Sequence, residues 1–122
     1  MALLPGQAAE QLVTLAANEA IDAYITANTI TDIYYITRKQ FSDTETRNKL
    51  RYLFMVFFVI DLFAADCQAA LDSPVQDYED AVLALCAEKS GVDYIITRDD
   101  AFLAQAGSLP VVSPQDFLKG FP

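Results

Sequence analysis

The chain has 122 residues, 53% of them hydrophobic, and this length and composition predict one compact domain over residues 1–122 that needs no disulfide or metal to hold its core. Seventeen acidic residues against eight basic ones give a net charge of −9, which counts against broad non-specific affinity for nucleic acid. Histidine is absent, which excludes His-ligated zinc and Ser-His or Cys-His catalysis, so any catalysis must rest on carboxylates.

The first half of the chain begins with apolar residues at helical spacing. In chain order it predicts a helix at 7–19, a strand at 22–27, helices at 28–39 and 42–57, and a buried strand within 57–62. An Asn or Thr cap opens the helix at 28–39. Ser42 or Asp43 caps the next one.

The second half contains the longest apolar-periodic helix, at 75–89, which ends at Gly91 in the left-handed cap position. The other elements predicted there are a helix at 64–72, a strand at 93–98, a helical turn at 100–106, a strand at 109–112, and a capped helix at 113–120. In that last helix Pro114 takes the first position and Gly120 lies past the end.

Strands alternate with helices along the whole chain. This order predicts an α/β fold with three layers, in which helices cover both faces of a parallel β-sheet. Ligands of such sheets gather outside the carboxyl ends of the strands, where Asp61 and Asp99 are expected to lie.

Two features of the sequence indicate where in the cell the protein is expected. The longest apolar run, 52–60, is well short of the roughly 18 residues that a membrane helix needs. The first residues, MALLPGQAAEQ, lack the pattern of a secretory signal. We therefore expect a cytoplasmic protein without a membrane span.

The basic residues are unevenly distributed, because five of the eight fall within residues 38–51. This segment is either a solvated helix face or a local surface for a polyanion. If it meets nucleic acid, Arg38, Lys39 and Arg47 are the candidate contacts.

Five aspartates need an explanation. Asp77 is best explained as a helix cap, and Asp61 marks a strand end. Asp99, which follows the predicted strand at 93–98, is an ordinary turn residue when considered alone. Asp80 directly precedes apolar residues, and Asp32 lies within a helix between two isoleucines, so neither has an obvious structural role.

Carboxylates brought together raise one another's pKa and need a counter-charge. Oxygen ligands of this kind suit Mg²⁺ or Mn²⁺, and the chemistry such a cation supports is hydrolysis of a phosphodiester.

Three motifs resemble the C-terminal half of a PIN domain, the ribonuclease fold of bacterial toxin–antitoxin systems: Glu79-Asp80-Ala81, Thr97-Arg98-Asp99 and the closing run Ser113 to Leu118. Upstream, ITANTITDIYYITRK resembles the segment with the family's second acid, where Asp32 stands in place of the more usual Glu. The resemblance covers roughly residues 7 to 120.

This resemblance implies a Mg²⁺- or Mn²⁺-dependent endoribonuclease in which Asp32, Asp80 and Asp99 meet in one hollow as catalytic residues and metal ligands. Thr97, Asp77 and Asp100 would support them. RNA would be the substrate, and an antitoxin protein a partner.

PIN domains open with a buried strand that ends in Asp-Thr/Ser-Asn, and this chain resembles an N-terminally truncated member without that strand and acid. We therefore expect weak or no RNA cleavage. We also expect either that the sheet closes up and re-pairs or that two chains share strands or edges in a homodimer.

Two other functions remain open. The chain resembles a catalytically degenerate PIN-like module that acts by binding a protein partner. A receiver-type phosphoacceptor domain with Asp61 as acceptor is disfavoured, because the sequence lacks an acidic pair after a first strand and a strand-end lysine.

Overall fold

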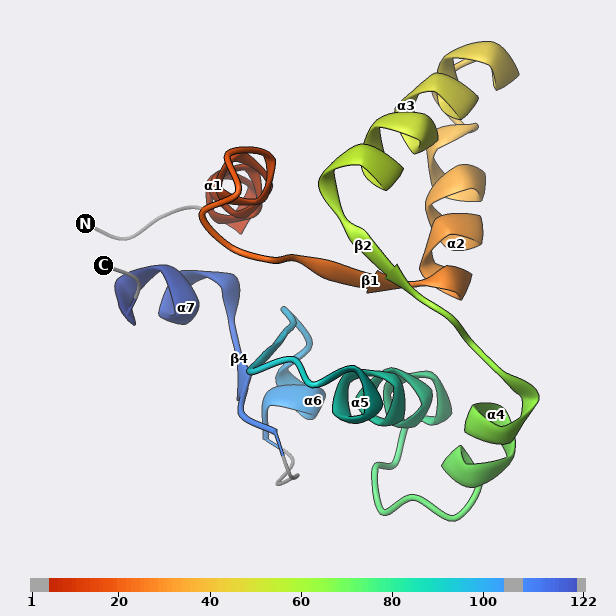
Figure 1. The fold of residues 1–122 in the computed structure, drawn as a ribbon, viewed down its shortest axis with the longest axis vertical. Helices are drawn as coiled ribbons and strands as arrows, with labels where there is room; N and C mark the ends of the chain where they lie inside the picture. The colour runs from red at the N-terminus through yellow and green to blue at the C-terminus, as the bar shows by residue number, and fades with distance from the viewer. Residues whose placement is uncertain (1–4, 105–108, 121–122) are drawn as a thin grey trace.

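The computed structural model describes residues 5–104 and 109–120, in which helices and short strands alternate (Figure 1). Its elements are α1 (Pro5–Ala17), β1 (Tyr24–Thr26), α2 (Ala27–Thr37), α3 (Asp43–Val56), β2 (Phe58–Ile60), α4 (Ala64–Ala70), α5 (Tyr78–Ser90), β3 (Ile95–Ile96), α6 (Asp100–Leu103), β4 (Val111–Val112) and α7 (Pro114–Gly120). The predicted α/β class, with parallel strands flanked by helices, is confirmed.

The strands pair as two separate parallel sheets. In the first, β1 lies beside β2 with Ile25 opposite Val59. In the second, β3 lies beside β4 with Ile95 opposite Val111. Among the described residues no ladder joins β1 to β3, so the expectation that the sheet closes up and re-pairs is wrong.

Helix α5 packs against residues of both sheets. Ala81, Val82 and Cys86 of α5 are buried with Ile60 of β2, and Ala87 is buried with Ile95 of β3 and Phe102 of α6. Because α5 contributes to both apolar clusters, it fixes the position of its own first turn relative to the ends of β2 and β3.

Several predicted boundaries are wrong by a few residues. Helix α5 begins at Tyr78 rather than at residue 75, because Asp77 is its N-cap, and α3, with 14 residues, is the longest helix in the described parts of the chain. Strand β4 is limited to Val111–Val112, since Pro110 has no N–H to donate and α7 begins at Pro114. The predicted strand at 93–98 is therefore paired only at Ile95–Ile96.

The remaining corrections concern helix ends. Thr26, not Asn28 or Thr29, occupies the N-cap position of α2, although its side chain makes no cap hydrogen bond; the helix therefore begins at Ala27 and cuts β1 short. Gly120 is the last residue of α7 rather than the residue after it. The helical turn predicted at 100–106 is found at Asp100–Leu103, and residues 105 and 106 lie outside the described residues. By contrast, Ser42 caps α3 as predicted.

Candidate functional site

Asp80 lies in the first turn of α5, three residues after the helix cap. The Asp80 backbone N–H donates to Oδ1 of Asp77 at 3.0 Å, so Asp77 acts as the cap that the sequence predicted. The Asp80 side chain is half-buried, and the next residue, Ala81, is fully buried. The helix therefore holds the Asp80 carboxylate at the edge of the core, where capping does not account for it.

Asp99 is placed by a hydrogen-bonded turn after β3. The Thr97 backbone N–H donates to the carbonyl of Val112 at 3.0 Å, which fixes Thr97 against β4. The Thr97 hydroxyl accepts from the Asp99 backbone N–H at 3.1 Å, and Oδ1 of Asp99 accepts from the Ala101 N–H at 2.9 Å as the cap of α6. These bonds hold Asp99 at the carboxyl end of β3, with Asp100 exposed beside it.

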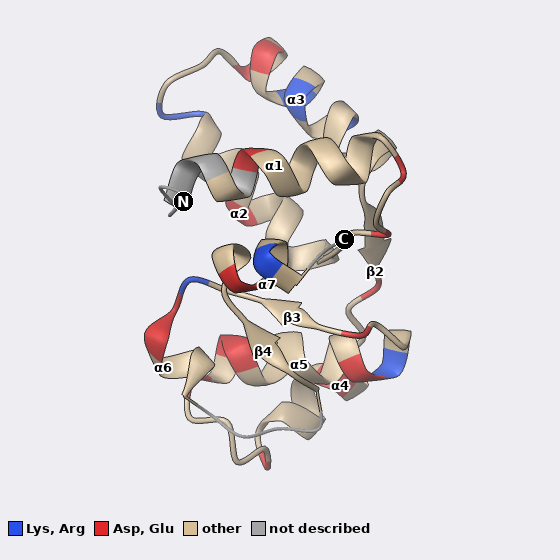
Figure 2. Cartoon of the chain, turned by 90° about the vertical axis from the view of Figure 1, so that its left-hand side faces the viewer, with Lys and Arg blue, Asp and Glu red and all other residues tan. Residues whose placement is uncertain are grey.

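The electrostatics of this region are dominated by negative charge. Burial raises the pKa of Asp80 most, and the charges of Asp77, Asp99 and Glu79 raise that pKa further, in that order. Figure 2 shows the acidic segments of α5 and α6 next to each other. A bound cation would offset both the burial and the repulsion at Asp80, so the Asp80–Asp99 pair has electrostatics that suit a cation.

Asp32 does not join this pair in the structure. It is exposed within α2, which lies in the other part of the molecule from α5 and α6 (Figure 1). In the described ranges, no three acidic or cysteine side chains are grouped so that they could hold a metal ion. Of the three carboxylates expected in one hollow, the structure therefore brings together Asp80 and Asp99.

Two carboxylates are a donor set that fits a hard divalent cation. Mg²⁺ keeps several of its waters and is commonly held by one or two carboxylates together with phosphate oxygens of a substrate. Asp80 and Asp99 offer such oxygens, and the raised pKa of Asp80 marks a carboxylate that gains from a cation. The pair thus fits Mg²⁺ or Mn²⁺ better than it fits a softer metal.

The basic residues proposed as nucleic-acid contacts lie at the start of α3 and before it. Arg38 donates to the Phe41 carbonyl at 2.8 Å, and Nε of Arg47 donates to Oδ2 of Asp43 at 2.7 Å. Lys39 is exposed. Arg47 is therefore paired with an acid, and Arg38 supports the turn between α2 and α3.

No local pattern in the sequence indicates the polar contact around Lys89. Its ammonium group donates to the Asp61 carbonyl at 2.9 Å and to Oδ2 of Asp66, and it lies 4.6 Å from the centroid of the Phe63 ring. The same Asp66 oxygen accepts from the Phe63 N–H. Lys89 therefore ties the end of α5 to the segment that follows β2, and this bond lowers the pKa of Asp66.

The sequence matches a known protein family. A family model described as "PIN domain" matches residues 1–101. No curated protein and no solved structure matches the chain. In the described part of the chain, no helix is long and apolar enough to cross a membrane.

Proposed function

Because this chain belongs to the PIN domain family, whose function is generally of the nuclease type, we propose that it is a toxin-type endoribonuclease that depends on Mg²⁺ or Mn²⁺. The observation that supports this best is the Asp80–Asp99 pair, in which a half-buried carboxylate is surrounded by negative charge. A cation bound there would favour the ionised form of Asp80, which burial and the neighbouring acids disfavour.

Each residue of the site has a proposed role. Asp80 and Asp99 would hold the cation. Asp32, which the structure places apart from them on α2, is the third carboxylate that the resemblance implies. Thr97 positions Asp99 through the turn, and Asp77 positions Asp80 through the cap. Asp100 adds negative charge beside Asp99. The cation, when bound, activates water and neutralises the charge that develops on the phosphate.

The proposed substrate is RNA, and Arg38, Lys39 and Arg47 are its proposed backbone contacts. We further propose that the chain forms a homodimer and pairs with an antitoxin protein. Cleavage is expected to be weak, because the described residues bring only two carboxylates close to each other and a cation held by two ligands is bound loosely.

Titration with Mn²⁺ and RNA cleavage test this proposal together. We expect the parent chain to bind Mn²⁺ in calorimetry. Asp80→Asn or Asp99→Asn should weaken that binding by about 100-fold or more, because each is proposed as a direct ligand and even the loss of a supporting residue costs about 10- to 100-fold. Asp32→Asn should weaken binding by only about tenfold. Asp72→Asn, at an exposed acid in the turn after α4, is the matched control and should change nothing.

A stability measurement shows whether the variants fold. The pKa of Asp80 is higher in the folded chain than in the unfolded chain, so ionising Asp80 lowers the free energy of unfolding. This loss is absent at a pH below the pKa of the unfolded chain and complete at a pH above the pKa of the folded chain. Asp80→Asn removes this loss, so the variant should resist urea at pH 7 at least as well as the parent, with a smaller advantage at lower pH. Mn²⁺-dependent cleavage that survives in Asp80→Asn would contradict the proposed site.

A second function is a PIN-like module that has lost catalysis and acts by binding a protein partner. It is favoured by the fact that the described residues hold no three-ligand group. If the parent chain shows no Mn²⁺ binding and no RNA cleavage while remaining folded, this second function replaces the first.

A further inference from the structure

Two cysteines lie where α4 and α5 pack against each other (Figure 1). Cys86 of α5 is fully buried, and Cys67 of α4 is half-buried. In α4 the residues that are not exposed are Asp66, Cys67 and Ala70, so Cys67 lies on the face of α4 that meets the core. Ala70, three residues later on that face, is buried in the same apolar cluster as Cys86. The face of α4 that carries Cys67 is therefore directed at α5 near Cys86.

Two hydrogen bonds fix the position of Cys67 along α5. The Tyr78 hydroxyl donates to the Cys67 carbonyl at 2.7 Å. From further along α5, the Lys89 ammonium donates to Oδ2 of Asp66. Tyr78, Cys86 and Lys89 are spaced eight and three residues apart, so they lie on one face of α5. Because side chains reach Asp66 and Cys67 from both ends of this face, Cys67 lies over the stretch between them, which contains Cys86.

The packing of two helices suits the geometry of a disulfide. Axes of packed helices are about 8–10 Å apart, and each Cα lies about 2.3 Å from its axis. Facing Cα atoms are therefore about 3.5–5.5 Å apart at the closest approach, and a disulfide needs about 4.4–6.8 Å. Ala70 and Ala81, both buried in the cluster of Cys86, are small enough to let the helices approach closely. A bond between Cys67 and Cys86 is thus within reach of this interface.

The two thiols differ in their access to solvent. Cys67 is half-buried and can meet a small reagent, whereas Cys86 is 0% exposed. Burial raises the pKa of the Cys86 thiol most, Lys89 lowers it, and Asp66 and Cys67 raise it further. Since the thiolate is the reactive form, Cys86 is a poor first nucleophile. A reagent therefore reacts first with Cys67.

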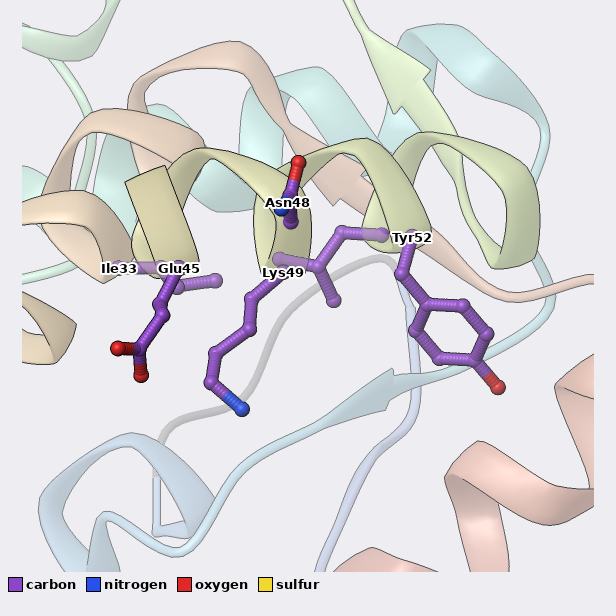
Figure 3. A pocket seen from close by; sticks show the side chains of 6 residues that line it. Ile33, Glu45, Asn48, Lys49 and Tyr52 are labelled. Atoms are coloured by element: carbon purple, nitrogen blue, oxygen red, sulfur yellow. The ribbon is translucent and has the colours of Figure 1, made fainter. Parts of the chain in front are cut away.

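The open pocket between α2 and α3, of about 590 Å³, does not lead to these thiols. Figure 3 shows Glu45 and Lys49 extending from α3 at this pocket. All of its lining residues belong to α2 and α3, so neither cysteine opens onto it. We therefore expect a reagent to reach Cys67 at the surface of α4.

We propose that Cys67 and Cys86 form a reversible redox site, which a small-molecule disulfide converts into one intramolecular disulfide between α4 and α5. The Cys67 thiolate attacks one sulfur of the small disulfide, whose S–S bond breaks, and one small thiol leaves. The Cys86 thiolate then attacks the Cys67 sulfur and displaces the second small thiol. Each cysteine gives up one proton, each departing thiolate takes one, and two electrons pass from the cysteine pair to the small disulfide.

The new bond would close a loop over residues 67–86, which contains the turn before α5 and most of α5. A disulfide around a loop of about 20 residues raises the ratio of folded to unfolded chain by about 100-fold. The redox state of the surroundings would thus set the stability of the α4–α5 unit. The proposal does not depend on the nuclease function, because neither cysteine belongs to the Asp80–Asp99 pair.

Glutathione disulfide is the probe, and peptide mapping under non-reducing conditions is the readout. After exposure, free thiols are alkylated, and the chain is unfolded and cut with a glutamate-specific protease. Cleavage after Glu79 leaves Cys67 and Cys86 in different peptides, which stay joined only through a disulfide. We expect joined peptides from the parent chain, their release by dithiothreitol, and a single-chain band on a non-reducing gel.

Two cysteine variants separate the steps of the reaction. Cys86→Ala has no second thiol, so a mixed disulfide between glutathione and Cys67 should accumulate. Cys67→Ser keeps only the buried thiol, so it should react at least about tenfold more slowly than the parent.

Urea unfolding gives a second measurement on the same samples. Glutathione disulfide should raise the ratio of folded to unfolded parent chain by about 100-fold and leave that of Cys67→Ser unchanged. Cys67→Ser replaces a half-buried residue by one of similar size, so the test holds even where Cys86→Ala does not fold.

Any of four results would overturn the proposal. These are a glutathione adduct that persists on Cys67 of the parent chain, a disulfide between two chains in place of one within a chain, reaction of Cys86 in Cys67→Ser as fast as in the parent, and two thiols that both stay free after prolonged exposure.

Discussion

Gly91 ends α5 with its backbone in the left-handed region, at φ 71°. A Cβ added there would meet nothing within 4 Å, so any cost of Gly91→Ala comes from the backbone alone. We expect the substitution to lower the free energy of unfolding by about 1 kcal/mol, since this conformation costs an alanine roughly 1–2 kcal/mol. Urea unfolding at pH 7 measures the change.

Gly120 provides the control for this prediction. A Cβ there also has open space, but Gly120 lies in α7 without a positive φ, so Gly120→Ala should be neutral or stabilise the chain by up to about 1 kcal/mol. Equal destabilisation by both substitutions would show that the left-handed conformation of Gly91 is not the cause.

At the scale of residues, the sequence predicts a role correctly where the hydrogen-bond partner of the residue is close in the chain. Ser42, Asp77 and Gly91 were all predicted as helix ends, because a cap bonds to a residue two or three positions away. The cap of α2 was misplaced because several suitable residues stand together there. The contact between Lys89 and Asp66 spans 23 residues, and no local pattern indicates it.

At the scale of elements, β3 pairs along one edge only within the described residues. The backbone N–H groups of Ile95 and Thr97 donate to the carbonyls of Pro110 and Val112 in the β4 segment, at 2.9 and 3.0 Å. Successive residues of a strand direct their N–H groups to opposite sides, so the N–H of Ile96 faces away from β4. In hydrogen exchange we therefore expect the Ile96 amide to exchange about tenfold faster or more than those of Ile95 and Thr97.

The outcome of that measurement also bears on assembly. Slow exchange at Ile96 in concentrated solution and fast exchange on dilution would mean that a second copy pairs with this edge, as in the homodimer with shared edges. Slow exchange at every concentration would contradict the open edge itself.

The sequence predicted the type and order of the elements but not how the strands pair. Helix periodicity and β-rich runs are local, so each helix and strand could be found within a few residues of its place. Pairing depends on which strand edges approach each other, and here that is decided by α5, which packs against Ile60 of one sheet and Ile95 of the other. No pattern within a single strand contains this information.

At the scale of the whole molecule, the difference between local patterns and packing explains which residues of the candidate site could be predicted from the sequence. Asp80 and Asp99 come from neighbouring elements, α5 and the turn after β3. The sequence predicts Asp99 at a strand end, and the family resemblance implies that the two residues meet. Asp32 comes from α2, in the other part of the molecule, and its position relative to the pair depends on how α5 packs against residues of both sheets. The Asp80–Asp99 pair could therefore be predicted from the sequence, and the position of Asp32 could not.

Because the chain has a net charge of −9, we expect its free energy of unfolding to depend on the salt in solution. NaCl should raise the free energy of unfolding, because it screens repulsion among the acids. MgCl₂ at the same ionic strength should raise it further, by about 1.4 kcal/mol when free Mg²⁺ is ten times the Kd, because a cation that binds only the folded chain stabilises it. Urea unfolding in the two salts measures the difference.

Asp80→Asn separates the two effects of salt. Screening acts on all seventeen acids and should survive the loss of one, whereas the extra effect of Mg²⁺ requires the Asp80–Asp99 pair. The variant should therefore respond to MgCl₂ as it does to NaCl. If the parent chain already responds equally to both salts at millimolar Mg²⁺, the folded chain gains nothing from a divalent cation beyond screening, and the negative charge around Asp80 must be tolerated for a reason other than metal binding.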